Sequence, residues 1–281
     1  MSRAARWAAL GMMALALPCR QARAQSAARY PAVTIAGTEV RQLHSQRTGR
    51  DYDIYVYLPS NYSRAPEQRY PVLYLTDAQW DFKLLTSIQG GLLYDRFNPE
   101  VMVVGITYPG ANANYDSLRV LDLTTVPNQG RPGSGGGPQF LAFLKDELIP
   151  WVESNYRADP AKRALMGNSL GGSFALFAAF SEPGLFSGIV AGSPAVTNGN
   201  RDGFAVEQRY AAAHRDLPIR LFISVGELED LAGPVGEYVN VVRGRNYQRL
   251  TLETRIIAGE RHSSNKPEAL NRGLRFVFGN R

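Results

Sequence analysis

Short apolar runs that alternate with helical segments place the strongest constraint on how this chain can fold. A strand that is apolar along its whole length has to be buried on both faces. Strands separated by helices are joined by crossovers and therefore form a parallel sheet. The pattern predicts an α/β protein with strands at Pro71–Leu75, Val101–Ile106, Ala164–Met166, Gly188–Ala191, Ile219–Val225 and the more mixed Leu250–Ile257.

The segment before these runs has a different pattern. Asp51–Leu58 alternates aliphatic residues with tyrosines, which is the period of a half-buried strand. It is separated from Arg41–Gln46 by the short stretch Arg47–Arg50, and the three segments together predict an antiparallel hairpin at one edge of the sheet.

Helices are expected in the second half of the chain. Gln139–Tyr156 has apolar residues at helical spacing, and Pro150 should introduce a kink. Pro234–Tyr247 and Pro267–Phe278 each begin with a proline, which suits a first helical turn. Asn128–Pro138 is rich in glycine and proline, so we interpret it as an inserted loop near the active edge of one domain.

Gly167–Gly171 reads G-N-S-L-G between an apolar run and the helical segment Phe174–Phe180. A serine on a sharp turn between a strand and a helix presents its hydroxyl at the open edge of the sheet. Glycines suit such a turn because a side chain at either end would meet neighbouring backbone. The motif predicts that Ser169 is a nucleophile. The alternative is a glycine-rich turn with Ser169 as an ordinary helix cap.

A serine hydroxyl needs an adjacent base to act as a nucleophile, and the chain has three histidines. His44 lies in the expected hairpin, and His214 follows a helical stretch that ends in alanines. His262 lies in a polar loop between the last strand and the last helix, where it would reach the same sheet edge as Ser169. We therefore expect His262 to be the base.

A carboxylate is expected beside that histidine, to set its tautomer and stabilise the imidazolium. Three acids, Glu227, Glu229 and Asp230, follow the strand Ile219–Val225. Glu229 is our choice because the spacing from Gly226 lets the chain turn before the side chain points back. Glu227 and Asp230 remain alternatives, as does a Ser-His dyad.

Ester and amide chemistry also needs backbone N–H groups to hold an oxyanion. The N–H of Leu170, directly after the nucleophile, is one expected donor. The second should come from the loop after the strand Pro71–Leu75, and we favour Gln79 over Ala78.

The first 24 residues have the pattern of an export signal. Arg3 and Arg6 precede the apolar run Trp7–Leu17, and Ala22–Ala24 forms a small-residue cleavage site. The apolar run is too short for a transmembrane helix, and no later segment approaches the required length. We expect residues 1–24 to be removed, residues 25–281 to form the catalytic domain, and the mature protein to be periplasmic or secreted.

Removal of that segment changes two inferences. Formal net charge falls from +6 to +2, because four arginines and no acids leave, so the basic pI does not indicate nucleic-acid binding. The sole cysteine, Cys19, leaves as well, so the mature chain has neither a disulfide nor a cysteine nucleophile. Pro18 makes Cys19 a poor lipoprotein site.

Several of these segments together resemble the putative-esterase branch of the α/β-hydrolase superfamily, which includes esterase D, feruloyl esterases, mycolyltransferases and siderophore esterases. The resemblance spans about residues 35–280. It is carried by four segments, Tyr70–Asp77, Gly167–Gly172, Ser224–Glu229 and His262–Ser264. Many relatives have Asp-Gly where this chain has Asp77-Ala78, which leaves the second oxyanion donor open.

The siderophore-esterase group looks most similar, through Ser224–Glu229 and Arg119–Thr124. The resemblance implies an α/β-hydrolase fold and serine hydrolysis of a small-molecule carboxylic ester, with no metal or cofactor. Arg119 would then hold an anionic substrate, or else pair with Asp122. Trp80 would line the acyl pocket or lie in the core. Acyl transfer or peptide hydrolysis on the same triad, and a non-catalytic binding protein, are the alternatives; the oligomeric state is not indicated.

Overall fold

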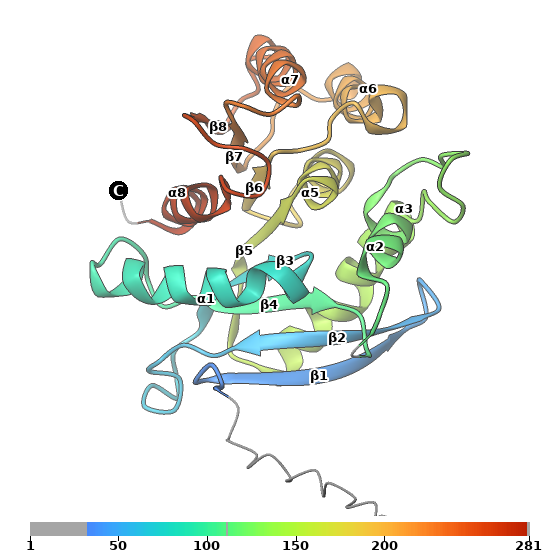
Figure 1. Ribbon diagram of the computed structural model, residues 1–281. Helices are drawn as coiled ribbons and strands as arrows, with labels where there is room; N and C mark the ends of the chain where they lie inside the picture. The colour runs from blue at the N-terminus through green and yellow to red at the C-terminus, as the bar shows by residue number, and fades with distance from the viewer. Residues whose placement is uncertain (1–32, 111, 280–281) are drawn as a thin grey trace, which may run out of the picture. The chain divides into compact units, whose positions relative to one another are not determined.

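The computed structural model describes residues 33–110 and 112–279, so the expected export signal at residues 1–24 lies outside the described residues. Contacts group the chain from Ile35 onward into one compact unit built on an eight-stranded sheet (Figure 1). Its strands are β1 (Thr38–Ser45), β2 (Arg50–Tyr57), β3 (Tyr70–Leu75), β4 (Met102–Thr107), β5 (Ala158–Asn168), β6 (Gly188–Gly192), β7 (Arg220–Gly226) and β8 (Thr251–Ile257).

The strand order is β1-β2-β4-β3-β5-β6-β7-β8. β1 and β2 form an antiparallel hairpin at one edge, and β2 is also antiparallel to β4. From β4 to β8 all neighbouring strands are parallel. This arrangement confirms the predicted mostly parallel sheet with an N-terminal hairpin at its edge.

Helices cover both faces of this sheet. α1 (Ala78–Tyr94) and α8 (Lys266–Phe278) pack against one face and against each other (Figure 1). The opposite face is covered by α3 (Gly137–Phe143), η1 (Leu144–Leu148), α4 (Ile149–Asn155), α5 (Leu170–Ser181), α6 (Asn198–Ala213) and α7 (Ala232–Gly244), with α2 (Tyr115–Leu123) against α3 and α5. The strands β3, β4, β6 and β7 and the second half of β5 are therefore buried on both sides, as their apolar sequences require.

The helical segment before β5 contains a π-helical turn over Leu144–Leu148. Pro150 is the second residue of α4, and the residues before it are helical as well, so the proline lies inside one continuous helical run. The kink at Pro150 stays a prediction.

The parallel strands direct all their carboxyl ends to one edge of the sheet. The loops after β3, β5, β6, β7 and β8 therefore lie along that edge, which is where ligands bind in open α/β sheets. Every residue that the sequence predicts as catalytic lies in one of these loops or at the start of the helix that follows.

Candidate active site

Ser169 lies on the sharp turn between β5 and α5. Its backbone has φ +60° and ψ −118°, a conformation that costs a non-glycine residue about 1–3 kcal/mol. A hydrogen bond to the neighbouring strand β6 holds the turn in place, because the N–H of Ser169 donates to the carbonyl of Gly192 at 2.9 Å. The hydroxyl is thereby set at the carboxyl edge of the sheet, as the motif predicts.

The glycines on either side of Ser169 are required by close packing. A Cβ on Gly167 would stand 2.6 Å from Thr76 Oγ1 and closer still to the carbonyl group of Gly171. A Cβ on Gly171 would overlap the same hydroxyl of Thr76. The nucleophile turn is therefore packed directly against the end of β3.

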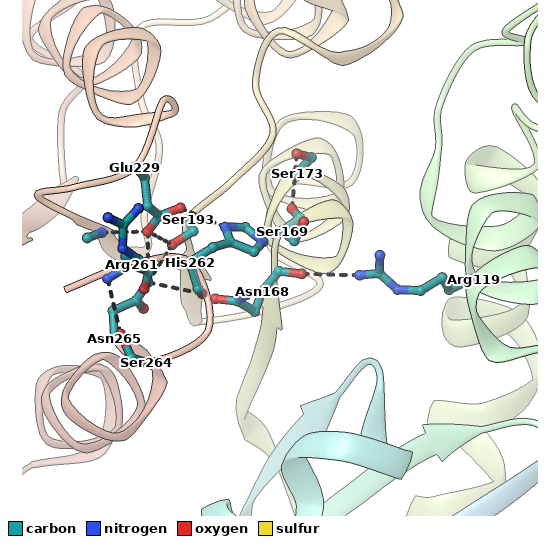
Figure 2. A network of polar contacts seen from close by, with 11 residues as sticks. Arg119, Asn168, Ser169, Ser173, Ser193, Glu229, Arg261, His262, Ser264 and Asn265 are labelled. Carbon is teal, nitrogen blue, oxygen red and sulfur yellow. Dashed lines mark hydrogen bonds and ion pairs between the residues drawn. The ribbon is translucent and has the colours of Figure 1, made fainter.

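His262 and Glu229 form a hydrogen-bonded pair. The distance from His262 Nδ1 to Glu229 Oε2 is 2.6 Å. Because a carboxylate only accepts, Nδ1 is the donor in this bond, and in the neutral imidazole with that tautomer Nε2 is the acceptor. Figure 2 shows the imidazole ring pointing from Glu229 toward Ser169. The Glu229 side chain is 3% exposed and the His262 side chain 43%, so the carboxylate is buried behind an imidazole that solvent can reach.

The structure separates Glu229 from the other two candidate acids. Glu227 is exposed, and its carboxylate accepts the N–H of Gly259 at 2.8 Å. Asp230 is also exposed. Of the three, only Glu229 has a hydrogen bond to His262 among the described residues.

The other two histidines lie away from this pair. His44 is exposed on β1, where its Nδ1 lies 2.7 Å from Asp51. His214 follows the last residue of α6 and stacks on Tyr210 with ring centroids 4.3 Å apart. Both positions agree with the places expected for them in the hairpin and at a helix end.

Ser193 and Asn265 join the pair from elements that the sequence analysis did not single out. Ser193 follows β6, and its hydroxyl donates to Glu229 Oε1 at 2.7 Å. Asn265 lies directly before α8, and its Nδ2 donates to the same oxygen at 2.7 Å. Both residues are fully buried. No motif or spacing in the sequence marks either residue, because the contacts depend on loops from three strands.

The two expected oxyanion donors lie at the starts of two helices. Leu170 is the first residue of α5, so its N–H has no partner within the helix. Gln79 is the second residue of α1, and its side-chain Oε1 accepts from Thr107 Oγ1 at 2.9 Å. Asp77, just before α1, has φ +56°. If Gly171 carried a Cβ, that atom would lie 3.2 Å from Asp77 Oδ2. The loop after β3 therefore packs against the turn at Ser169.

The expected alternative pairing of Arg119 with Asp122 is wrong. Arg119 Nε and Nη2 instead bind the two carboxylate oxygens of Asp77, at 2.8 and 2.6 Å. Asp122 turns into the core, where it accepts hydrogen bonds from Arg50 and Tyr52. The i, i+3 spacing on α2 suggested a local pair, but the helix buries Asp122 against β2 instead.

Asp77 also changes the electrostatics of Arg119. Burial alone would lower the pKa of this guanidinium, but the hydrogen bonds and charge of Asp77 outweigh burial and raise it. Nη2 additionally reaches the carbonyl oxygen of Asn168 at 3.4 Å, as Figure 2 shows. Arg119 is therefore a charged link between the loop after β3 and the last residue of β5.

Trp80 is not a core residue. It is 44% exposed, which excludes the core alternative. The guanidinium of Arg119 lies 5.5 Å from the centre of its ring, and Tyr115 packs edge-on at 6.3 Å. Trp80 therefore shields the Arg119–Asp77 pair from one side.

A cavity of about 720 Å³ opens beside Ser169. α2 contributes Arg119 to its wall, and the inserted loop contributes Arg131. The remaining lining residues are Asp116, Ser117, Val120, Leu121, Gly130, Pro132, Ser169, Leu170, Ala195 and Asn198. The inserted loop therefore lies near the active edge, as expected, and the cavity has two arginines against one acid.

Within residues 33–110 and 112–279, no group of three or more His, Cys, Asp or Glu side chains is arranged to hold a metal ion. No helix among them combines the length and the apolar character needed to cross a lipid bilayer.

Comparison with known proteins decides the family. Residues 45–266 match the family described as Putative esterase. The chain belongs to this family. It is also 30% identical over 271 residues to the ferri-bacillibactin esterase BesA of Bacillus subtilis, across 88% of this chain and 91% of the relative. Ester hydrolysis is therefore the reaction class of this esterase.

Solved structures agree with that assignment. The BES protein of Bacillus cereus superposes with a TM-score of 0.81 at 26% identity, over 90% of this chain and 98% of that one. The siderophore hydrolase EstB of Aspergillus nidulans has a TM-score of 0.79 at 23% identity, over 89% and 98%. These similarities confirm the predicted α/β-hydrolase fold of the esterase.

Proposed function

We propose that this esterase is a serine hydrolase in which Ser169, His262 and Glu229 form the catalytic triad. The observation that carries the proposal is the 2.6 Å bond between His262 Nδ1 and Glu229, on loops beside the strained turn of Ser169. Nucleophile, acid and base follow in the order Ser, acid, His along the chain, which is the order of α/β-hydrolases.

In the first half of the reaction, the Oγ of Ser169 attacks the ester carbonyl while His262 Nε2 takes the hydroxyl proton. The oxyanion that forms is held by the N–H groups of Leu170 and Gln79. Glu229 stabilises the imidazolium through Nδ1–H. His262 then gives its proton to the leaving alcohol oxygen, and the acyl group stays on Ser169.

The second half repeats these steps with water as the nucleophile. His262 takes a proton from the water as it attacks the acyl carbonyl, and returns that proton to Ser169 Oγ when the acid leaves. No proton or bond is left over, so the chain's own residues suffice for the cycle. Acyl transfer would follow the same path with another alcohol in place of water.

The substrate we propose is a ferric siderophore trilactone or a related aromatic ester. The relatives named for siderophore esters support this choice. The cavity beside Ser169 also supports it, since Arg119 and Arg131 on its wall favour an anionic ligand. Asp77 offsets much of the charge of Arg119, so we assign Arg119 first to holding the loop after β3. Trp80 lies next to Arg119 and would meet the aromatic part of the substrate.

Turnover by wild type and Ser169→Ala tests the reaction. Wild type is expected to hydrolyse p-nitrophenyl esters, while Ser169→Ala keeps the circular dichroism spectrum and loses activity by about 10⁶-fold. Retained turnover in the variant would overturn the assignment. A panel of ferric trilactones, feruloyl esters and short aliphatic esters, with competing alcohols and peptides, then ranks the substrate classes and detects acyl transfer or peptide hydrolysis.

We also propose that residues 1–24 are an export signal and that residues 25–281 are the catalytic domain of a periplasmic or secreted enzyme. The charged, apolar and small-residue regions of that segment support this. Mass spectrometry of the exported protein should give an N-terminus at Gln25. An uncleaved N-terminus in the cytoplasmic fraction would contradict it.

A further inference from the structure

The two carboxylate oxygens of Glu229 have different partners. Among the described residues, Oε2 accepts only from His262. Oε1 accepts three hydrogen bonds, from the N–H of Gly226 at 2.6 Å, from Ser193 Oγ at 2.7 Å and from Asn265 Nδ2 at 2.7 Å. Burial of a carboxylate that is 3% exposed is costly without hydrogen-bond donors, and these donors also hold it in one orientation. The contacts on Oε1 therefore decide where Oε2 lies relative to the imidazole.

Asn265 differs from the other two donors because it also holds the loop of the base. Its Nδ2 lies 2.9 Å from the carbonyl oxygen of Arg261 and 3.1 Å from that of His262. Figure 2 shows this side chain beneath Glu229 and His262, within the same network. One amide group thus contacts both the acid, on the loop after β7, and the backbone of the base, on the loop after β8.

The chemistry of these contacts requires a hydrogen-bond donor at position 265. A carboxylate and two carbonyl oxygens can only accept, so the amide nitrogen has to face them. The amide oxygen of Asn265 has no hydrogen-bond partner within the described part of the chain. The polar contacts of this fully buried side chain are therefore all made by its nitrogen.

Asn265 is itself held in place by the fold. It directly precedes α8, and the next residue, Lys266, reaches across to Asp81 on α1 with a 2.7 Å ion pair. Burial raises the pKa of Asp81, while the charge and hydrogen bond of Lys266 oppose that rise. Asn265 is therefore anchored at the start of α8, which packs against α1, rather than on a free loop.

We propose that Asn265 is a positioning residue that fixes Glu229 and the His262 loop in one geometry. The inference rests on the proposed function, in which Glu229 orients His262. Asn265 does not line the cavity beside Ser169, so its loss should lower kcat and leave KM unchanged. Misplacement of a catalytic group by about 1 Å can cost 10²-fold in rate, and we expect a loss of about this size.

Two substitutions separate donation from packing. Asn265→Asp keeps the size of the side chain but places an acceptor where the amide donor stood. Asn265→Ala removes both the donor and the packing of the side chain. Each is measured for kcat and KM on a p-nitrophenyl ester, together with the thermal unfolding midpoint. We expect kcat to fall by about 10²-fold in both variants. A wild-type kcat in folded Asn265→Asp would overturn the proposal.

A double-mutant cycle with Glu229→Ala shows whether Asn265 acts through the acid. If it does, Asn265→Ala has little further effect once Glu229 is absent. An equal fold-loss in both backgrounds, or a loss confined to KM, would contradict the positioning role. Ser193→Ala removes one hydrogen-bond donor to Oε1 of the same carboxylate, so it provides the same cycle if the Asn265 variants do not fold. We expect Ser193→Ala to lower kcat by less than the Asn265 variants do, and to have no further effect on kcat in the Glu229→Ala background.

Asn155→Ala is the matched control. Asn155 Nδ2 donates to the carbonyl oxygen of Trp151, four residues earlier, at 2.8 Å. Asn265 makes the same kind of bond to Arg261, but Asn155 lies at the end of α4. The Asn155→Ala variant should keep wild-type kcat. If Ser169→Ala stays active or Glu229→Ala keeps full kcat, the proposed function fails and this inference with it. Full activity in the Asn265 variants alone overturns only the inference.

Discussion

The turn at Ser169, our proposed nucleophile, and the His262–Glu229 pair, our proposed base and acid, lie at the same sheet edge but are held by different forces. Ser169 is positioned by backbone geometry, since its φ of +60° is fixed between strand and helix and Gly167 leaves no room for a side chain. His262 and Glu229 are positioned by side-chain hydrogen bonds from three loops. One half of the site is thus defined by steric exclusion and the other by polar partners.

The difference has a consequence for how each half responds to substitution. A changed contact in the nucleophile turn strains the packing of β3 against β5, so stability and activity should fall together. A changed side chain in the acid–base pair alters proton transfer while the strands stay packed. The following three substitutions test this distinction, in decreasing order of expected effect on rate.

His262→Ala is expected to have the largest effect. Without the base, Ser169 cannot lose its proton, and kcat should fall by about 10⁶-fold. The side chain is 43% exposed, so the unfolding midpoint should change little. His214→Ala is the control, with unchanged turnover per folded molecule, since the imidazole of His214 contacts Tyr210 on α6 by stacking and by a 3.1 Å contact of Nδ1 with the Tyr210 carbonyl oxygen. Comparable losses of rate in both variants would show that His262 is not the base.

Glu229→Gln is expected to lower kcat by about 10⁴-fold. The three donors on Oε1 require an oxygen there, so the new amide group faces His262 and donates to Nδ1. The imidazole proton then moves to Nε2, which can no longer accept from Ser169. Steady-state kinetics on a p-nitrophenyl ester measures the loss.

Asp230→Asn is the matched control for the acid. Asp230 is exposed and has no hydrogen bond to His262 among the described residues, so this variant should keep wild-type kcat. A large loss in Asp230→Asn with an active Glu229→Gln would reverse the assignment.

Gly167→Ala is expected to lower both the free energy of unfolding and kcat. Its Cβ would stand 2.6 Å from Thr76 Oγ1, and overpacking of this kind costs about 1–3 kcal/mol of unfolding free energy. The turn would shift Ser169, with a rate loss of about 10²-fold. Denaturant unfolding and kinetics on the same samples measure the two effects.

Gly236→Ala on α7 is the control for that substitution. A Cβ there would meet no atom within 4 Å, and alanine should stabilise the helix by about 0.5–1 kcal/mol. Loss of activity in Gly167→Ala without loss of stability would contradict the distinction between the two halves.

The sequence predicted the fold and the sharp turn at Ser169 because both depend on local patterns. Apolar runs such as Ile219–Val225 need burial on both faces, and glycines beside a serine need a tight turn. The position of His262 after the last strand follows from the same topology, since parallel strands send their following loops to one edge.

The acid could be narrowed only to three neighbouring residues. Which of Glu227, Glu229 and Asp230 points toward the base depends on how the chain turns after β7, and that turn is fixed by contacts with Gly226 and Asn265. The partner of Arg119 could not be found either. Asp77 lies 42 residues away, and the pair forms only because the fold brings α2 beside the loop after β3.

Labelling with a fluorophosphonate probe tests the central claim most directly, because the probe reacts with an activated serine hydroxyl. Wild type should be labelled on the peptide that contains Ser169. Ser169→Ala should not be labelled, and His262→Ala should react far more slowly. Equal labelling of wild type and Ser169→Ala, or a wild-type rate in His262→Ala, would contradict the claim that His262 activates Ser169.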